Sequence, residues 1–164
     1  MQETDRRMQE TDKLVKNLTR QVSGITDSLG RTAEEMVLAA VVQLFRQRHI
    51  EFSRIHPRLA APLNGETMEV DVVGVGPECV VVIEVKHRLK RWDVENILEK
   101  LPRFFAFFPT LKRPTLYGGV AGMSIEEGVD RFAYKQGLFV LAPSGDNMQV
   151  INDEGFRPKS FPSG

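Results

Sequence analysis

Apolar side chains recur every seven residues at the beginning of the chain. The segment MQETDRR is followed at once by MQETDKL, and the same period continues beyond it. Methionine, valine or leucine falls at every a position of this heptad, with threonine, leucine or isoleucine at d. The pattern predicts a coiled-coil helix over residues 1–30 that joins two copies of the chain; a single solvated helix is the other interpretation. Gly30 marks its expected end, because glycine weakens helices.

A second helical pattern begins at Thr32 and runs to about Arg48, with one apolar face. Glu34 lies on that face, because one and two helical turns after it the same side carries apolar residues, whereas Glu35 lies toward the rim. An acid in the first turn of a helix has an ordinary explanation in the helix dipole. Of the two neighbouring acids, Glu34 is the candidate for a functional site.

Two apolar runs in the middle of the chain, residues 70–75 and 79–85, are joined by the turn sequence Gly-Pro-Glu. They predict a β-hairpin of two buried strands. Strand alternation places Asp71 on the opposite side from the two valines that flank it, and places Glu84 and Lys86 on one face. The hairpin can therefore bring Asp71 close to Glu84 and Lys86.

The rest of the chain alternates between helical and strand patterns, which argues for an α/β sandwich with a mixed sheet. Residues 51–65 contain two prolines and are expected to form a loop. The phenylalanines after Pro102 share a face with leucines, so we expect them in the core rather than on a base-stacking platform. After the hairpin we expect a helix over 91–108 that breaks at Pro102, a strand over 115–123, a helix from Ser124 to Gly137, and strands over 138–143 and 148–153.

Composition narrows the classes of function. The 164 residues suit one domain with a core, which we place at residues 31–164, after the coiled coil. The formal net charge is zero, so a nucleic-acid partner would have to be met by a local basic patch. The single cysteine argues against a disulfide framework, and neither a signal peptide nor a long apolar segment is evident. We expect a soluble cytoplasmic protein with no membrane partner.

Asp71, Glu84 and Lys86 are expected to converge at the end of the sheet. Two carboxylates that would repel each other can share a hard divalent cation such as Mg²⁺. A lysine beside them can orient or deprotonate an attacking water, or stabilise charge on a phosphate. These are the parts of metal-assisted phosphodiester hydrolysis. Taken alone, however, the tripeptide Glu-Val-Lys is equally explained by a structural ion pair at a strand end.

The wider context of these residues resembles the PD-(D/E)XK nuclease superfamily. An acidic helix start is followed by a strand with Asp71, a short turn, and a buried strand that ends in Glu84-Val85-Lys86. EVDVVGVGPECVVVIEVK, YGGVAG and YKQGLFVLAPSGD also look like a group of uncharacterised bacterial proteins, many of them cyanobacterial, that join a coiled coil to such a domain. The resemblance covers residues 32–152. It implies a restriction-endonuclease-like core, a central mixed sheet flanked by helices, preceded here by the coiled-coil helix.

The resemblance also implies roles for particular residues. The implied catalytic residues are Glu34, Asp71, Glu84 and Lys86. The implied cofactor is Mg²⁺ or Mn²⁺, with Asp71, Glu84 and Val85 as its ligands and Glu34 as a further ligand, direct or through water. The implied activity is hydrolysis of phosphodiester bonds in nucleic acid, with DNA favoured over RNA.

Basic residues around the motif are candidates for contacts with phosphates, although solvated charge is the ordinary interpretation of any single one. They are His87, Arg88, Lys90 and Arg91 directly after it, with Arg54, His56 and Arg58 in the expected loop before the hairpin. Two other functions remain open. The domain can be a nucleic-acid-binding module without turnover, or a scaffold whose working part is the coiled coil.

Overall fold

The computed structural model of the chain describes residues 9–10, 13–14 and 32–161. The predicted coiled coil over residues 1–30 therefore lies almost wholly outside the described residues, as does its expected end near Gly30. A compact unit begins at Ala33. Among the described residues, no helix is long and apolar enough to cross a membrane.

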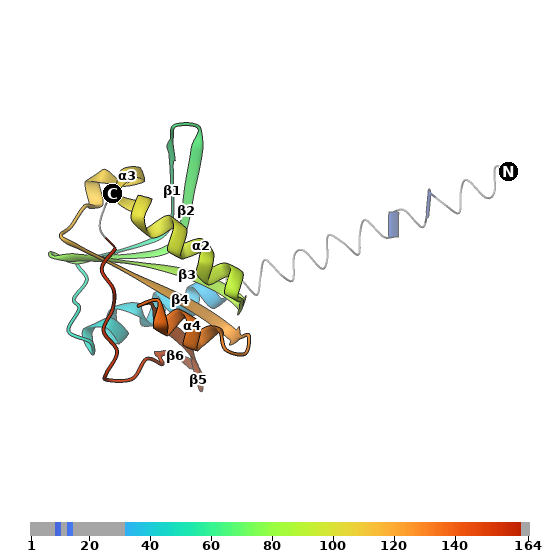
Figure 1. Cartoon of the computed structure of the whole chain (residues 1–164). Helices are drawn as coiled ribbons and strands as arrows, with labels where there is room; N and C mark the ends of the chain where they lie inside the picture. Colours follow the sequence, from blue (N-terminus) through green and yellow to red (C-terminus); the bar gives the residue numbers. More distant parts are fainter. Residues whose placement is uncertain (1–8, 11–12, 15–31, 162–164) are drawn as a thin grey trace. The chain divides into compact units, whose positions relative to one another are not determined.

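A mixed sheet of six strands forms the centre of this unit, with the strands arranged side by side in chain order (Figure 1). The first three strands are antiparallel, the fourth is parallel to both its neighbours, and the sixth is antiparallel to the fifth. The expected α/β class with a mixed sheet is confirmed. The strands are β1 (Arg54–Leu63), β2 (Glu66–Val75), β3 (Cys79–Leu89), β4 (Thr115–Ile125), β5 (Phe139–Ser144) and β6 (Asn147–Val150).

Helices cover both faces of the sheet, and each face has its own apolar core (Figure 1). The helix over residues 32–46 covers one face. Alternate side chains of β3 point to opposite sides, so that Val82 packs toward α2 and Ile83 packs toward the 32–46 helix. On the other face lie α2 (Arg91–Lys100), η1 (Leu101–Arg103), α3 (Phe104–Phe107), η2 (Pro109–Leu111) and α4 (Val129–Lys135).

The helical segment after β3 breaks where it was predicted to break. Pro102 lies in the short 3-10 turn η1, between α2 and α3. The phenylalanines that follow it are buried in the core on this face, which confirms their expected position. These are Phe104, Phe105, Phe107 and Phe108.

Residues 54–63 form the edge strand β1 and not the loop expected from their prolines. Pro57 and Pro62 both stand opposite residues of β2. An edge strand tolerates proline, because the missing N–H is not needed on the side that has no neighbour. Asn64 and Gly65 join β1 to β2 with φ angles of 52° and 82°, as a tight hairpin turn requires.

Strand β2 changes face at Asp71. Val72 packs under the 32–46 helix, but Val70 packs in the core beside α2. The expectation that both valines point to the same side is therefore wrong. The reason is a break in the hydrogen-bonded ladders, in which Asp71 is paired with neither β1 nor β3. Arg58 is the residue of β1 that falls opposite this break, and its φ is 46°. The break leaves Asp71 half-buried.

The helix expected to begin at Ser124 begins later. Ser124 still belongs to β4, where it pairs with Arg88 of β3. The parallel ladder therefore extends past the expected cap, and α4 begins at Val129 after Gly128, whose φ is 83°. The expected end of this helix at Gly137, with φ 81°, is confirmed.

The segment after β6 completes both cores. Phe156 packs on the face of the 32–46 helix, and Phe161 packs on the face of α2. The backbone N–H of Phe161 donates a hydrogen bond of 2.8 Å to the Leu116 carbonyl of β4. The folded unit therefore extends beyond residue 152, where the sequence resemblance ends.

Candidate active site

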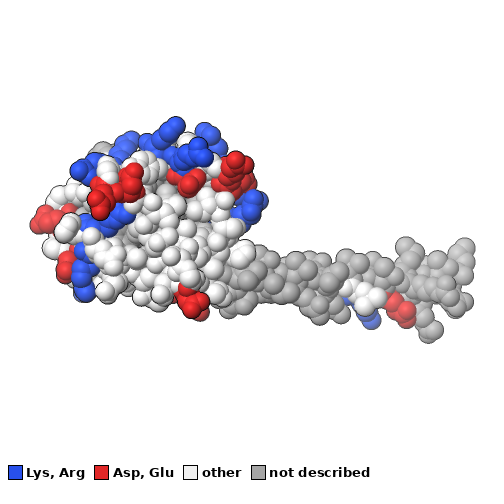
Figure 2. All heavy atoms as spheres, turned by 90° about the horizontal axis from the view of Figure 1, so that it is seen from below, with Lys and Arg blue, Asp and Glu red and all other residues white. Residues whose placement is uncertain are grey.

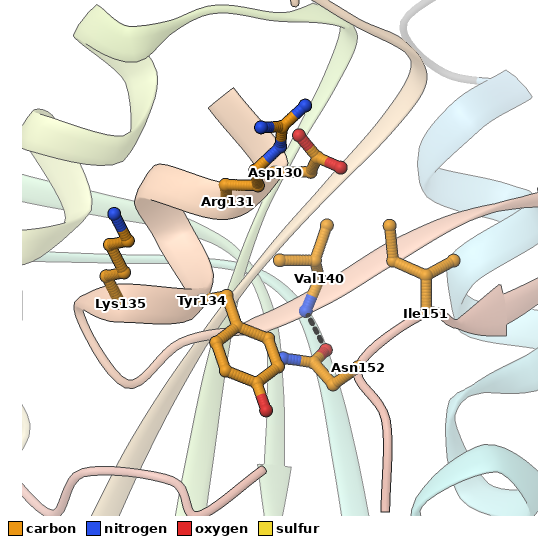
Figure 3. Close-up of a pocket in the computed structure, with 7 residues that line it drawn as sticks. All are labelled: Asp130, Arg131, Tyr134, Lys135, Val140, Ile151 and Asn152. Carbon is orange, nitrogen blue, oxygen red and sulfur yellow. Dashed lines mark hydrogen bonds between the residues drawn. The ribbon is translucent and has the colours of Figure 1, made fainter. Parts of the chain in front are cut away.

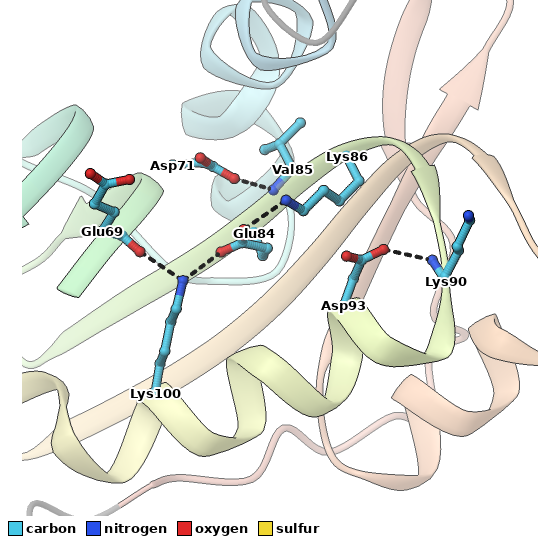
Figure 4. A network of polar contacts seen from close by, with 8 residues as sticks. All are labelled: Glu69, Asp71, Glu84, Val85, Lys86, Lys90, Asp93 and Lys100. Atoms are coloured by element: carbon cyan, nitrogen blue, oxygen red, sulfur yellow. Dashed lines mark hydrogen bonds and ion pairs between the residues drawn. The ribbon is translucent and has the colours of Figure 1, made fainter. Parts of the chain in front are cut away.

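Asp71 and Glu84 meet where β2 and β3 separate. The last ladder pair of these strands is Val72 opposite Ile83. Just beyond it, Asp71 Oδ2 accepts a hydrogen bond of 2.8 Å from the backbone N–H of Val85 (Figure 4). Asp71 and Glu84 are therefore neighbours on adjacent strands, as the hairpin predicted.

Glu84 is a buried carboxylate between two lysines (Figure 4). Its side chain is 9% exposed. Lys86 Nζ lies 3.6 Å from Glu84 Oε1, and Lys100 Nζ lies 3.6 Å from Glu84 Oε2. Lys86 follows on the same strand, whereas Lys100 comes from the last turn of α2. These ammonium groups offset part of the cost of burying the charge.

The two lysines do not fully compensate Glu84. Burial, followed by the nearby charge of Asp71, raises the pKa of the Glu84 carboxyl from 4.5 to about 7, although Lys100 and Lys86 act to lower it. Glu84 Oε2 is buried, and within the described part of the chain it has no hydrogen-bond partner. Glu84 therefore keeps an oxygen that a further positive charge can bind.

The donor atoms of the site fit a hard divalent cation. Mg²⁺ and Mn²⁺ prefer oxygen ligands, and Mg²⁺ is commonly held by only one or two carboxylates with water in the remaining positions. Asp71 and Glu84 supply such a pair, and the unsatisfied Glu84 oxygen is an atom that a cation would satisfy. Val85 has no donor in its side chain and would contribute its backbone carbonyl. Residues 32–161 contain no group of three or more His, Cys, Asp or Glu side chains arranged for a metal.

Glu34 lies beside Asp71 but is held by an arginine. Glu34 Oε2 accepts a hydrogen bond of 2.7 Å from Arg58 Nε. Both residues line the same hollow as Asp71, with a volume of about 310 Å³. The hydrogen bond and charge of Glu34, and more weakly the charge of Asp71, raise the pKa of the Arg58 guanidinium. Glu35 is exposed and does not line this hollow.

Sequence reasoning missed Lys100 and misplaced Arg58. A lysine in the last turn of a helix is ordinary, because it complements the helix dipole, so nothing marked Lys100. Its proximity to Glu84 arises because α2 runs back along β3 and returns its last turn to the site (Figure 4). Arg58 was assigned to a loop, whereas β1 places it opposite Asp71.

The basic residues after the motif are exposed, but they are not equivalent. Arg91 is engaged within the chain, since its Nε lies 3.1 Å from Glu95 Oε1 and its guanidinium lies 4.0 Å from the centre of the Phe132 ring. His87, Arg88 and Lys90 remain exposed. Figure 2 shows Lys and Arg side chains interspersed with Asp and Glu along one rim of the molecule, while much of the face in view is uncharged.

A separate hollow of about 200 Å³ lies beside α4 (Figure 3). Tyr134 and Lys135 line it, so these residues belong to a different surface from the carboxylate pair. Asn152, also in its lining, is a structural residue. Its side chain accepts a hydrogen bond of 2.7 Å from the Val140 N–H and donates one of 3.1 Å to the Leu138 carbonyl.

Among known proteins, no family model matches the chain, and no curated protein matches it. Two solved structures are similar to it. A repair endonuclease from Pyrococcus abyssi has a TM-score of 0.44 at 22% identity, over 65% of this chain and 45% of its own length. An EndoMS–dsDNA2 complex has a TM-score of 0.41 at 20% identity, over 67% and 44%. This chain spans less than half the length of either.

Proposed function

We propose that this chain is a metal-dependent nuclease that hydrolyses phosphodiester bonds, with DNA favoured over RNA and with Mg²⁺ or Mn²⁺ as cofactor. The observation that carries the proposal is the carboxylate pair Asp71 and Glu84. Glu84 is buried, its pKa is raised to about 7, and one of its oxygens is unsatisfied. Perturbed acids of this kind concentrate at functional sites. The resemblance of residues 32–152 to the PD-(D/E)XK superfamily agrees with this assignment.

The proposal gives each residue a distinct task. Asp71, Glu84 and the Val85 carbonyl would hold the metal, which when bound generates a water nucleophile at neutral pH and stabilises charge on the phosphate. Lys86 has an exposed fraction of 44%, and its ammonium can donate hydrogen bonds to a substrate phosphate. Arg58 holds Glu34 beside Asp71, where the Glu34 carboxylate can bind water.

Binding of nucleic acid would rely on a small patch, because the net charge of the chain is zero. His87, Arg88 and Lys90 are its exposed members. Few phosphate contacts predict modest affinity for nucleic acid and a shallow dependence of that affinity on salt.

We also propose that two copies of the chain associate through residues 1–30. Measuring the mass of the protein in solution tests this association.

The test is cleavage of supercoiled plasmid and of single-stranded DNA and RNA with Mg²⁺, with Mn²⁺ and with a chelator. The wild-type chain should cleave DNA with metal and lose the activity with chelator. Lys86→Met should reduce cleavage at least about 100-fold, the scale on which positioned charges act in catalysis. Lys112→Met is the matched control, since Lys112 is exposed and lies between α3 and β4.

Binding can be followed in the same preparations through Trp92. It is the single tryptophan of the chain, is 67% exposed in the first turn of α2, and follows Lys90 by two residues. Quenching of its fluorescence by DNA, without cleavage under any metal condition, would contradict the nuclease proposal and favour a nucleic-acid-binding module without turnover. Neither quenching nor cleavage would contradict both functions and favour an interaction protein.

A further inference from the structure

Lys100 makes a hydrogen bond to the backbone, and within the described residues Lys86 makes none. Lys100 Nζ donates a hydrogen bond of 2.8 Å to the backbone carbonyl of Glu69 and lies 3.6 Å from Glu84 Oε2 (Figure 4). Its side chain is 27% exposed, against 44% for Lys86. The carbonyl that holds it belongs to β2, two residues before Asp71. Lys100 therefore ties the end of α2 to both strands that carry the carboxylates.

The two lysines approach different oxygens of the same carboxylate. Lys86 faces Glu84 Oε1, and Lys100 faces Oε2, the buried oxygen that has no hydrogen-bond partner in the described part of the chain. At 3.6 Å, each contact is an ion pair rather than a short hydrogen bond. Lys86 has no such anchor among the described residues, so it can turn toward a substrate while Lys100 stays in place.

We propose that Lys100 is the resident counter-ion of Glu84, a positioning residue that holds the metal-free site together and competes with the metal for Glu84. The inference rests on the proposed metal site. It assigns the two lysines separate tasks, with Lys100 serving the empty site and Lys86 serving the substrate. Two cations that share one carboxylate repel each other, so Lys100 and the metal must oppose each other's binding.

If Lys100 only stabilised the fold, its removal would not tighten metal binding, whereas a counter-ion that competes with the metal should weaken it. At pH 8.5, with Glu84 ionised, removing the Lys100 charge should make Mn²⁺ bind about threefold tighter or more, because a like charge leaves the neighbourhood of the metal. The same change should destabilise the metal-free protein, because Glu84 loses one of its partners. The rise in melting temperature that Mn²⁺ produces should therefore be larger in the variant than in the wild type.

The experiment measures the melting temperature of the full chain with and without Mn²⁺, together with Mn²⁺ affinity by calorimetry. Lys100→Met removes the charge and the anchor. Lys100→Gln keeps a hydrogen-bond donor for the Glu69 carbonyl without the charge, and covers the case in which Lys100→Met does not fold. Lys100→Arg keeps the charge, and exposed Lys112→Met is the matched control.

A larger Mn²⁺-induced shift and tighter binding in Lys100→Met and Lys100→Gln, with wild-type behaviour in Lys100→Arg and Lys112→Met, support the proposal. Equal or smaller shifts in Lys100→Met and Lys100→Gln, while the wild type binds Mn²⁺, would overturn it and leave the nuclease proposal intact. If the wild type binds no Mn²⁺, the proposed metal site fails and this inference fails with it.

Discussion

At the scale of single residues, the site is organised around the Glu84 carboxylate, whose burial costs free energy. Glu84 was singled out because a charged residue ends a buried strand, and Asp71 and Lys86 followed from strand alternation and spacing. The relation of Glu84 to Lys86 could be predicted because β3 keeps its period of two, whereas Asp71 was placed near them by the hairpin although β2 changes face there. Lys100 could not, since its approach to Glu84 depends on the length and direction of α2 rather than on any local pattern.

The raised pKa of Glu84 predicts an unusual dependence of stability on pH. In the metal-free chain, the folded state holds the proton of Glu84 up to about pH 7, whereas the unfolded state releases it near pH 4.5. The free energy that Glu84 contributes to folding is therefore fully present below pH 4.5 and is lost as the pH rises through about 7. Ionised Glu84 costs the folded state free energy, and a neutral glutamine does not.

Glu84→Gln should therefore be close to the wild type in free energy of unfolding at pH 5 and more stable at pH 8. We expect a gain on the order of 1–3 kcal/mol at pH 8, from the size of the pKa shift. Denaturant unfolding of both proteins in chelator at the two pH values measures it. A difference that stays the same at pH 5 and pH 8 would show that Glu84 does not titrate as described.

At the scale of elements, the strands and helices with one strong signal were predicted, and those with competing signals were not. The two prolines of β1 outweighed Asn64-Gly65, which is a strong signal for a tight hairpin turn. Ser124 suggested a helix cap, but ladder pairing with β3 extended β4 beyond it. The β1 strand therefore had a local signal that was outweighed, whereas the extension of β4 depends on pairing with β3, which no local pattern records.

The glycines of β4 give a test at this scale. A Cβ on Gly118 would lie 2.4 Å from Leu101 Cδ1 and 2.8 Å from Leu138 Cδ2, whereas on Gly119 the nearest atoms would be 3.4 Å away. Gly118→Ala should destabilise the fold by about 1–3 kcal/mol, because the η1 turn that follows Lys100 must move away from the sheet. Gly119→Ala should cost clearly less. Thermal melts of the two variants compare them, and equal losses would contradict this packing.

At the scale of the whole molecule, two layers of helices hold the sheet so that its β2–β3 junction carries the carboxylate pair. The mixed sheet and its flanking helices could be predicted, because alternating helical and strand patterns in one short chain leave few other arrangements. The contribution of Phe156 and Phe161 to the two cores could not, since isolated aromatic residues in a terminal segment show no periodicity. The balanced charges of the chain are consistent with a site that depends on local groups rather than on an overall field.

The central claim is that Asp71 and Glu84 bind a divalent cation, and calorimetric titration of Mg²⁺ and Mn²⁺ tests it most directly. The wild-type chain should bind metal at pH 8, more weakly at pH 6 as Glu84 takes up its proton, and Glu84→Ala should not bind it at either pH. Lys86→Met should still bind metal, because Lys86 is not a ligand. Absence of binding in the folded wild-type chain, or unchanged binding in Glu84→Ala, would contradict the account.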